Sequence, residues 1–211
     1  MLAAAALPDL DAIDVLLPQT QCQRCGYADC RAYASAMHSG TANINRCPPG
    51  GEPTRVALAA LLQRPELPLA DDVDAYAAEH VARIDEAACI GCAACLPVCP
   101  TDAIVGASKR MHTVIAADCT GCELCIIACP VDCIALVPAV TEANRVHASL
   151  TARAPQSSAL RSKYLAHQRR YTERAEAKAA AHVPKPATAK QALLADILAR
   201  AKARAAVPPR S

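Results

Sequence analysis

Two copies of one cysteine pattern constrain the fold of this chain more than any other feature. The segments CIGCAACLPVCPTDAI (89–104) and CTGCELCIIACPVDCI (119–134) align without gaps at an offset of 30 residues, and each reads C-x2-C-x2-C-x3-C-P. A repeat this short is one supersecondary unit used twice. In each unit we expect a loop with the first cysteines, a short helix (93–98 and 123–128) and a brief apolar strand.

Disulfides, zinc and iron–sulfur clusters are the three candidate explanations for the 13 cysteines of this chain. The odd count leaves one cysteine over, and the first residues, MLAAAALPDLDAID, show no secretory signal, so a disulfide framework is disfavoured. Zinc sites usually pair two C-x2-C knuckles around one ion, which two triplets followed by Cys-Pro do not fit. The repeat therefore favours iron–sulfur clusters.

The spacing within each unit also predicts how the cysteines are shared. Three thiolates within seven residues can reach one cluster as the loop curls, whereas the fourth sits one helical turn further on and serves the other cluster. We therefore expect two ligand sets, Cys89, Cys92, Cys95 with Cys129, and Cys119, Cys122, Cys125 with Cys99.

Residues 86–137 resemble the two-cluster [4Fe-4S] ferredoxins through these motifs. The resemblance implies a pseudo-twofold α+β fold and one-electron transfer between adjacent clusters. Residues 103–105 and 113–115 read as a hairpin. Gly91 and Gly121 occupy the same repeat position, where backbone N–H groups are expected to approach sulfide.

Four more cysteines precede the repeat, separated by two, four and 16 residues: Cys22, Cys25, Cys30 and Cys47. Four thiolates suit one zinc ion or one iron–sulfur cluster, and the spacing alone leaves both open. The string QTQCQRCGYADCRAYASAM, followed by INRCPPGGE, resembles the amino-terminal [4Fe-4S] domain of the RnfB (RsxB) family, the B subunits of Rnf electron transport complexes. CPVDCI (129–134) is also found in that family, so the resemblance spans roughly residues 10–140. It implies a third [4Fe-4S] cluster on these four cysteines.

The resemblance implies an electron-transfer subunit of an ion-translocating ferredoxin:NAD oxidoreductase or SoxR-reducing complex, rather than a catalyst by itself. Its redox partners are then Rnf/Rsx subunits or a soluble reductase. No nucleophile–base pair, G-x-G-x-x-G or phosphate-binding loop appears, so no substrate or flavin site is encoded locally. Two alternatives stay open: a stand-alone soluble ferredoxin-like carrier, and a regulatory or nucleic-acid-associated iron–sulfur protein.

Charge divides the chain into an acidic body and a basic tail. Residues 1–140 hold 8 Lys and Arg against 16 Asp and Glu, a net charge of −8, whereas residues 141–211 hold 14 against 4, a net charge of +10. We predict an α+β protein in four parts: a small helical 4Fe-4S domain (1–68), a linker (69–85), the two-cluster ferredoxin domain (86–138) and an Ala/Lys/Arg-rich helical, partly disordered tail (139–211). Helices are also expected over 9–17, where Pro18 stops the helix, and over 52–64.

The tail is predicted to form helices over 158–182 and 189–206, neither packed into the main core. Three roles stay open for the tail: a solvated extension, a membrane-surface helix and nucleic-acid binding. Nucleic-acid binding is disfavoured because the tail shows no aromatic interleaving. In the membrane interpretation, residues 189–206 lie on the lipid surface. Their apolar face is Leu193, Leu194, Ile197 and Leu198, with Lys190, Arg200, Lys202 and Arg204 around it.

No run of 18 apolar residues occurs, and members of the RnfB family usually begin with a membrane-anchoring helix. We therefore expect a form lacking that helix, cytoplasmic or peripheral on the cytoplasmic face of the inner membrane.

The remaining candidate residues receive structural interpretations. Cys133 stands where the first unit has Ala103, and we interpret it as a small buried apolar side chain, with a redox or labile-ligand role as the alternative. Tyr27 and Tyr33 are expected to pack beside the first cysteine group. The six histidines show no ligand-like spacing and are interpreted as surface or structural: His38, His80, His112, His147, His167 and His182.

Overall fold

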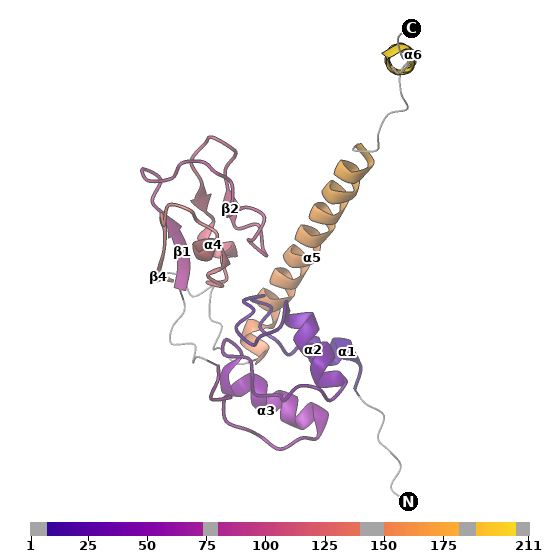
Figure 1. The fold of residues 1–211 in the computed structure, drawn as a ribbon. Coiled ribbons are helices and arrows are strands. Elements are labelled where there is room, and N and C mark those ends of the chain that lie inside the picture. The colour runs from indigo at the N-terminus through magenta and orange to yellow at the C-terminus, as the bar shows by residue number, and fades with distance from the viewer. Residues whose placement is uncertain (1–7, 74–79, 140–149, 182–188, 206–211) are drawn as a thin grey trace, which may run out of the picture. The chain divides into compact units, whose positions relative to one another are not determined.

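The computed structural model of the chain describes residues 8–73, 80–139, 150–181 and 189–205 (Figure 1). The chain divides into two compact units, Met1–Arg170 and Tyr171–Ser211. All 12 predicted cluster ligands lie in the first unit and within the described residues.

Three helices surround the core of the amino-terminal region: α1 (Leu10–Asp14), α2 (Cys30–His38) and α3 (Gly51–Leu62). α1 ends ahead of Pro18, as predicted, and α3 matches the helix expected over 52–64. Aliphatic residues, one tyrosine and three of the cysteines share this core: Ile13, Leu17, Tyr33, Met37, Ile44, Leu58, Cys25, Cys30 and Cys47.

Tyr33 confirms the packing role expected for it. Its side chain is 1% exposed, and its ring centroid lies 5.2 Å from that of Tyr27. The Tyr33 hydroxyl donates to the Asn43 carbonyl at 2.7 Å and accepts from the Arg46 N–H at 3.1 Å. The phenol therefore ties the loop that carries Cys47 to α2.

Two small antiparallel sheets form the ferredoxin-like region. β1 (His80–Ile84) pairs with β4 (Ile134–Pro138), with Ile84 opposite Ile134, and β2 (Ile104–Val105) pairs with β3 (Thr113–Val114). The second pair confirms the predicted hairpin. The first pair corrects the linker predicted over 69–85, because its last residues form β1 and belong to the sheet.

The two cysteine units share backbone geometry but differ in their helices. Residues one repeat apart adopt matching left-handed φ values: Gly91 and Gly121 (68° and 63°), Ala93 and Glu123 (63° and 67°), and Asp102 and Asp132 (51° and 51°). The second unit forms α4 (Leu124–Ile127) after a short 3₁₀ helix, η1 (Ala116–Asp118). Residues 94–98 of the first unit form only turns, so the helix predicted over 93–98 is wrong. Pro97 accounts for the difference, since it has no N–H to donate within a helix.

The long helix α5 (Leu150–Ala181) corrects another expectation about the tail. Its residues Ser157, Leu160 and His167 are buried, so this part of the tail does pack onto the first unit. Ion pairs explain the packing, because basic side chains of α5 meet acidic side chains of the body. Arg161 pairs with Asp14 at 3.1 Å, and Lys163 pairs with Asp118.

The described side chains from Thr172 to Ala181 are exposed. In the second unit, α6 (Ala189–Ala205) agrees with the helix expected over 189–206, and its side chains from Gln191 to Lys202 are exposed. Among the helices in the described ranges, none is both long enough and apolar enough to cross a lipid bilayer.

Candidate iron–sulfur centres

The amino-terminal site comprises Cys22, Cys25, Cys30 and Cys47. Cys22 and Cys25 lie on the loop before α2, Cys30 is the first residue of α2, and Cys47 lies just before α3. Asp29 caps α2 by accepting from the Ala32 N–H at 2.7 Å, which fixes the helix start. A Cβ on Gly50 would lie 2.7 Å from Thr54 Oγ1 and 3.1 Å from Cys47 Sγ, so only glycine lets this turn approach the thiol.

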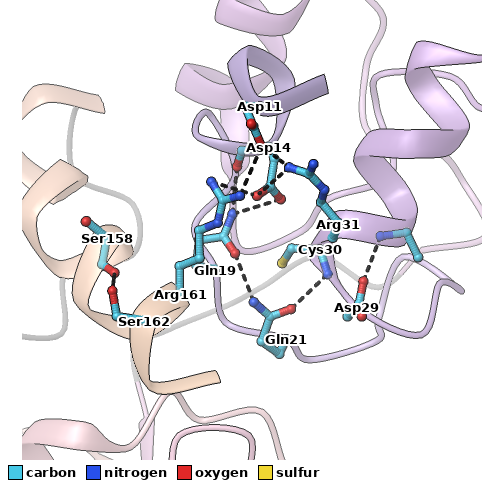
Figure 2. Close-up of polar contacts among 11 residues, drawn as sticks. Asp11, Asp14, Gln19, Gln21, Asp29, Cys30, Arg31, Ser158, Arg161 and Ser162 are labelled. Atoms are coloured by element: carbon cyan, nitrogen blue, oxygen red, sulfur yellow. Dashed lines mark hydrogen bonds and ion pairs between the residues drawn. The ribbon is translucent and has the colours of Figure 1, made fainter. Parts of the chain in front are cut away.

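A chain of buried glutamines connects this site to a charged cluster. Gln21 accepts from the Cys30 N–H at 2.8 Å and donates to Gln19 at 2.9 Å, and Gln19 in turn donates to Asp14 Oδ1 at 3.1 Å. Figure 2 shows Arg31 of α2 and Arg161 of α5 meeting the same Asp14 carboxylate. The backbone beside Cys30 is therefore held by residues that extend to α5.

The first ferredoxin site comprises Cys89, Cys92, Cys95 and Cys129. These four cysteines line one cavity, together with apolar side chains, His112 and Cys133. Cys95 is buried, but Cys92 is exposed, and the neighbouring Ile90 side chain is 61% exposed. The site is therefore open on one side.

The second ferredoxin site comprises Cys99, Cys119, Cys122 and Cys125. They line a separate cavity with Ala82, Ala103, Ile104 and Val114 among the apolar neighbours. Cys119 Sγ accepts from the Ala82 N–H at 3.3 Å, and Cys99 Sγ accepts from the Ala103 N–H at 3.2 Å. Each cavity thus brings together three cysteines of one repeat unit and the fourth cysteine of the other.

Burial makes several of these thiols hard to ionise without a metal. It raises the pKa of Cys122 to about 11 and that of Cys125 to about 12. Burial also raises the pKa of Cys30 well above its ordinary value, and the nearby thiols of Cys47, Cys22 and Cys25 add to the effect. Ligation requires thiolates, so metal binding at these sites must release protons.

The donor set fits iron–sulfur clusters. All 12 candidate ligands are cysteines, the ligand type that holds [4Fe-4S] clusters, and two sets line cavities with apolar walls. Gln19, Gln21 and Gln23, on the loop that leads into the amino-terminal site, adopt left-handed φ values of 58°, 54° and 60°. Within the described ranges, no three His, Cys, Asp or Glu side chains converge as they would around a single metal ion.

Two residues that were not predicted as ligands contact candidate ligands of the first ferredoxin site. His112 is 1% exposed, and its Nδ1 lies 3.3 Å from Cys89 Sγ, so it takes the structural position of the two that were expected, surface or structural. Cys133 is buried as predicted, but its Sγ also lies 3.5 Å from Cys129 Sγ. No ligand-like spacing marks His112, because a loop that folds back brings it to Cys89.

The other histidines divide between structural positions and residues outside the described ranges. His167 is also buried, and its Nδ1 lies 2.8 Å from Asp102 Oδ1. His38 and His80 are partly buried. His147 and His182 lie outside the described residues.

The amino-terminal region contacts the second ferredoxin site directly. The Thr120 hydroxyl, beside Cys119, donates to the Thr20 carbonyl at 3.1 Å. Arg24, between Cys22 and Cys25, pairs with Glu123, between Cys122 and Cys125. Cysteine-bearing loops about 100 residues apart in sequence therefore meet.

Family models match both cysteine regions. Residues 82–136 match a family described as a 4Fe-4S dicluster domain. Residues 17–49 match a family described as "Putative Fe-S cluster". The two matches include all 12 candidate ligands.

Curated relatives carry both regions in one chain. The chain is 57% identical over 132 residues to the B subunit of the ion-translocating oxidoreductase complex of Alkalilimnicola ehrlichii, covering 62% of this chain and 71% of the relative. It is 60% identical over 132 residues to the corresponding subunit of Hahella chejuensis, covering 63% and 66%. Identity to the corresponding subunit of Yersinia pestis is 53% over 135 residues, covering 64% and 72%. The chain therefore belongs to the RnfB (RsxB) family, the B subunits of ion-translocating oxidoreductase complexes.

Proposed function

We propose that this chain is an electron-transfer subunit with three [4Fe-4S] clusters, one at each of the three sites. The amino-terminal site uses Cys22, Cys25, Cys30 and Cys47. The first and second ferredoxin sites use the cysteines that line their two cavities. The observation that carries this proposal is the pair of thiol-lined cavities, since each combines cysteines of both repeat units.

Clusters of this type, when bound, supply one-electron chemistry. The residues around them bind the clusters and control the access of water. The apolar walls of the second ferredoxin site limit hydration, and backbone N–H groups of Ala82 and Ala103 donate to ligand sulfur. Solvent exposure and hydrogen bonds to sulfur are both factors that set a reduction potential.

The contacts between the sites support a relay with two different ends. The Thr120–Thr20 and Arg24–Glu123 contacts make the second ferredoxin site the neighbour of the amino-terminal site. The first ferredoxin site has exposed Cys92 and Ile90, which leaves it accessible to an external redox protein. By family membership, the partners are other subunits of an ion-translocating oxidoreductase complex.

Anaerobic purification with iron and sulfide counting tests the cluster content. Three clusters predict about 12 iron atoms per chain, together with the EPR signals of reduced [4Fe-4S] centres. Replacing Cys30 with Ser should remove about one third of the iron while leaving both ferredoxin sites loaded. A count near 8 iron atoms with one zinc would overturn the assignment of the amino-terminal site.

Co-purification tests the assignment to a complex. The untagged chain in an anaerobic lysate should associate with membrane fractions that contain the other subunits. Recovery as a monomer without partners would favour the stand-alone carrier. Retention on DNA that is lost with salt or nuclease would favour the nucleic-acid-associated alternative.

Contact with a membrane surface through α6 is a separate part of the proposal. Leu193, Leu194, Ile197 and Leu198 are each more than half exposed, so their apolar area is available to lipid. In liposome flotation, the double variant Leu194→Ser and Leu198→Ser should float less than the unmodified chain. A matched variant, Ala195→Ser, keeps the apolar face and should float normally. Equal flotation of all three proteins would remove this role for α6.

A further inference from the structure

His112 makes a side-chain contact with a candidate cluster ligand. Its imidazole is 1% exposed, lines the cavity of the first ferredoxin site, and places Nδ1 at 3.3 Å from Cys89 Sγ. The other ring nitrogen, Nε2, is buried and has no hydrogen-bond partner. Nδ1 therefore faces the sulfur of a candidate ligand, whereas Nε2 faces surroundings that offer no polar partner.

Two glycines make this placement possible. A Cβ on Gly106 would lie 2.2 Å from His112 Cδ2, so the backbone at this position accommodates the ring only without a side chain. Gly91, in the cysteine loop, accepts at its carbonyl from the Lys109 N–H at 2.8 Å, and a Cβ there would lie 2.6 Å from the Arg110 backbone nitrogen. The loop before His112 is thus packed against the loop that carries Cys89.

The chemistry of a ligated cysteine determines the direction of the hydrogen bond. A cysteine that binds iron is a thiolate and has no proton to donate, so Cys89 can only accept. A proton must then sit on Nδ1 of His112, and in the neutral imidazole Nε2 carries a lone pair. This tautomer also avoids leaving a buried N–H donor without an acceptor, which is more costly than leaving a lone pair unused.

A packing role alone does not account for a histidine at this position. An apolar side chain of similar size would fill the same space without burying an unpartnered nitrogen. The interaction with Cys89 is the feature that an apolar residue would lose.

We propose that His112 is a positioning residue that donates an N–H···S hydrogen bond to Cys89 and raises the reduction potential of the first ferredoxin site. Reduction adds negative charge to the cluster and its thiolates, so a donor to sulfur stabilises the reduced form more than the oxidised form. The inference rests on the proposed function, because it requires a cluster on Cys89.

This interaction distinguishes the first ferredoxin site from the second. Cys119, the repeat equivalent of Cys89, accepts from the backbone N–H of Ala82, a donor that is independent of the side chain at that position. The first site therefore has a donor to the Cys89 sulfur that a single substitution can remove.

Redox titration of anaerobically purified protein, followed by EPR, tests the proposal. In His112→Leu, one of the three midpoint potentials should fall, and the other two should stay unchanged. We expect a shift of up to about tenfold in the ratio of reduced to oxidised sites at fixed potential, which corresponds to about 59 mV for one electron. His112→Asn, whose side-chain amide can donate from nearly the same position as Nδ1, should recover most of the wild-type value.

Selective ¹⁵N labelling of histidine supplies a second measurement on the unmodified protein. Pulsed EPR of the reduced protein should detect a weakly coupled histidine nitrogen at one cluster, and the coupling should vanish in His112→Asn. His38→Asn, a change on α2 in the amino-terminal region, should leave both the coupling and the potentials unchanged.

Each outcome has a distinct meaning. About 12 iron atoms per chain with unchanged potentials in His112→Leu and no histidine coupling would overturn the role of His112 while leaving the proposed function intact. Equal shifts of all three potentials would indicate a general structural effect and also overturn it. If His112→Leu cannot hold its cluster, the labelled wild-type protein and His112→Asn decide the question. Few iron atoms in the unmodified chain would instead contradict the proposed function.

Discussion

The two ferredoxin sites are built from one repeated sequence pattern, yet their surroundings differ. The second site is in contact with other parts of the first unit: Thr120 and Glu123 contact the amino-terminal region, and Lys163 of α5 pairs with Asp118 beside Cys119. The first site has an exposed cysteine, Cys92, and a histidine that contacts the Cys89 sulfur. The repeat therefore specifies the candidate ligands, while residues outside the cysteine pattern specify the environment of each site.

The largest effect is expected from a test of whether each repeat unit supplies its fourth cysteine to the cluster of the other unit. The double variant Cys99→Ala and Cys122→Ala should lose about 4 iron atoms per chain, because both residues belong to the second site. The matched variant Cys99→Ala and Cys95→Ala should lose about 8, since it damages both ferredoxin sites. Iron counting with EPR measures the difference. The reverse pattern would mean that each unit supplies all four ligands of its own cluster.

The packing of α5 beside the second site should depend on Arg161. Asp14 is 1% exposed and is paired with Arg161 at 3.1 Å and Arg31 at 3.7 Å, so Arg161→Met leaves a buried carboxylate with only the more distant Arg31 as a charged partner, beside the Gln19 amide. We expect the local opening free energy of residues 157–170 to fall by about 1–2 kcal/mol, measured by native-state hydrogen exchange. Lys178→Met, in the exposed part of the same helix, is the control. Equal exchange in both variants would mean that the ion pair contributes little.

His167 should make the same packing sensitive to mild acid. Burial lowers the pKa of His167 below its ordinary value of 6.5, despite the nearby Asp102 carboxylate, which is also paired with Arg170. A released helix therefore binds the proton more readily than the packed one. The contribution of neutral His167 to the packing of α5 is complete above pH 6.5. It is lost as the pH falls through the lowered pKa that His167 has in the packed state. Hydrogen exchange of residues 157–170, corrected for intrinsic rates, should show this trend. If His167→Gln shows a pH dependence of the same size, a group other than His167 causes it.

The smallest expected effect comes from Cys133. The matched position of the first repeat unit is Ala103, which shows that the fold tolerates alanine there. Burial and the neighbouring Cys129 raise the pKa of Cys133 to about 12, so it stays a thiol that can donate to Cys129 Sγ. Cys133→Ala should keep about 12 iron atoms and lower only the potential of the first site, by less than His112→Leu does. Loss of iron would instead make Cys133 a ligand.

The sequence predicted the features that depend on local patterns. The repeated cysteine pattern indicated two equivalent backbone units, and short apolar stretches around a turn indicated the hairpin of β2 and β3. Helical periodicity indicated α3. These features need only residues that are close in sequence.

The features that the sequence did not predict depend on distant partners. β1 is a five-residue strand, and its partner β4 lies about 50 residues away. The position of His112 depends on a loop that folds against Gly91. The segment 157–170 of α5 has few apolar residues, so its packing depends on ion pairs with residues as distant as Asp11 and Asp14. Helix propensity could indicate α5 but not the surface that it contacts.

The place of α5 in the chain also has a consequence for biosynthesis. A ribosome makes the amino terminus first, so all 12 candidate ligands emerge before Leu150, where α5 begins. While α5 is still being made, the Asp14, Asp29, Asp102 and Asp118 side chains that it later contacts are free to meet water or a cluster-delivery protein. We expect cluster loading to be possible before this helix docks. Protease cleavage within residues 157–170, followed as iron and sulfide are added to the full-length apo chain, would show which event comes first.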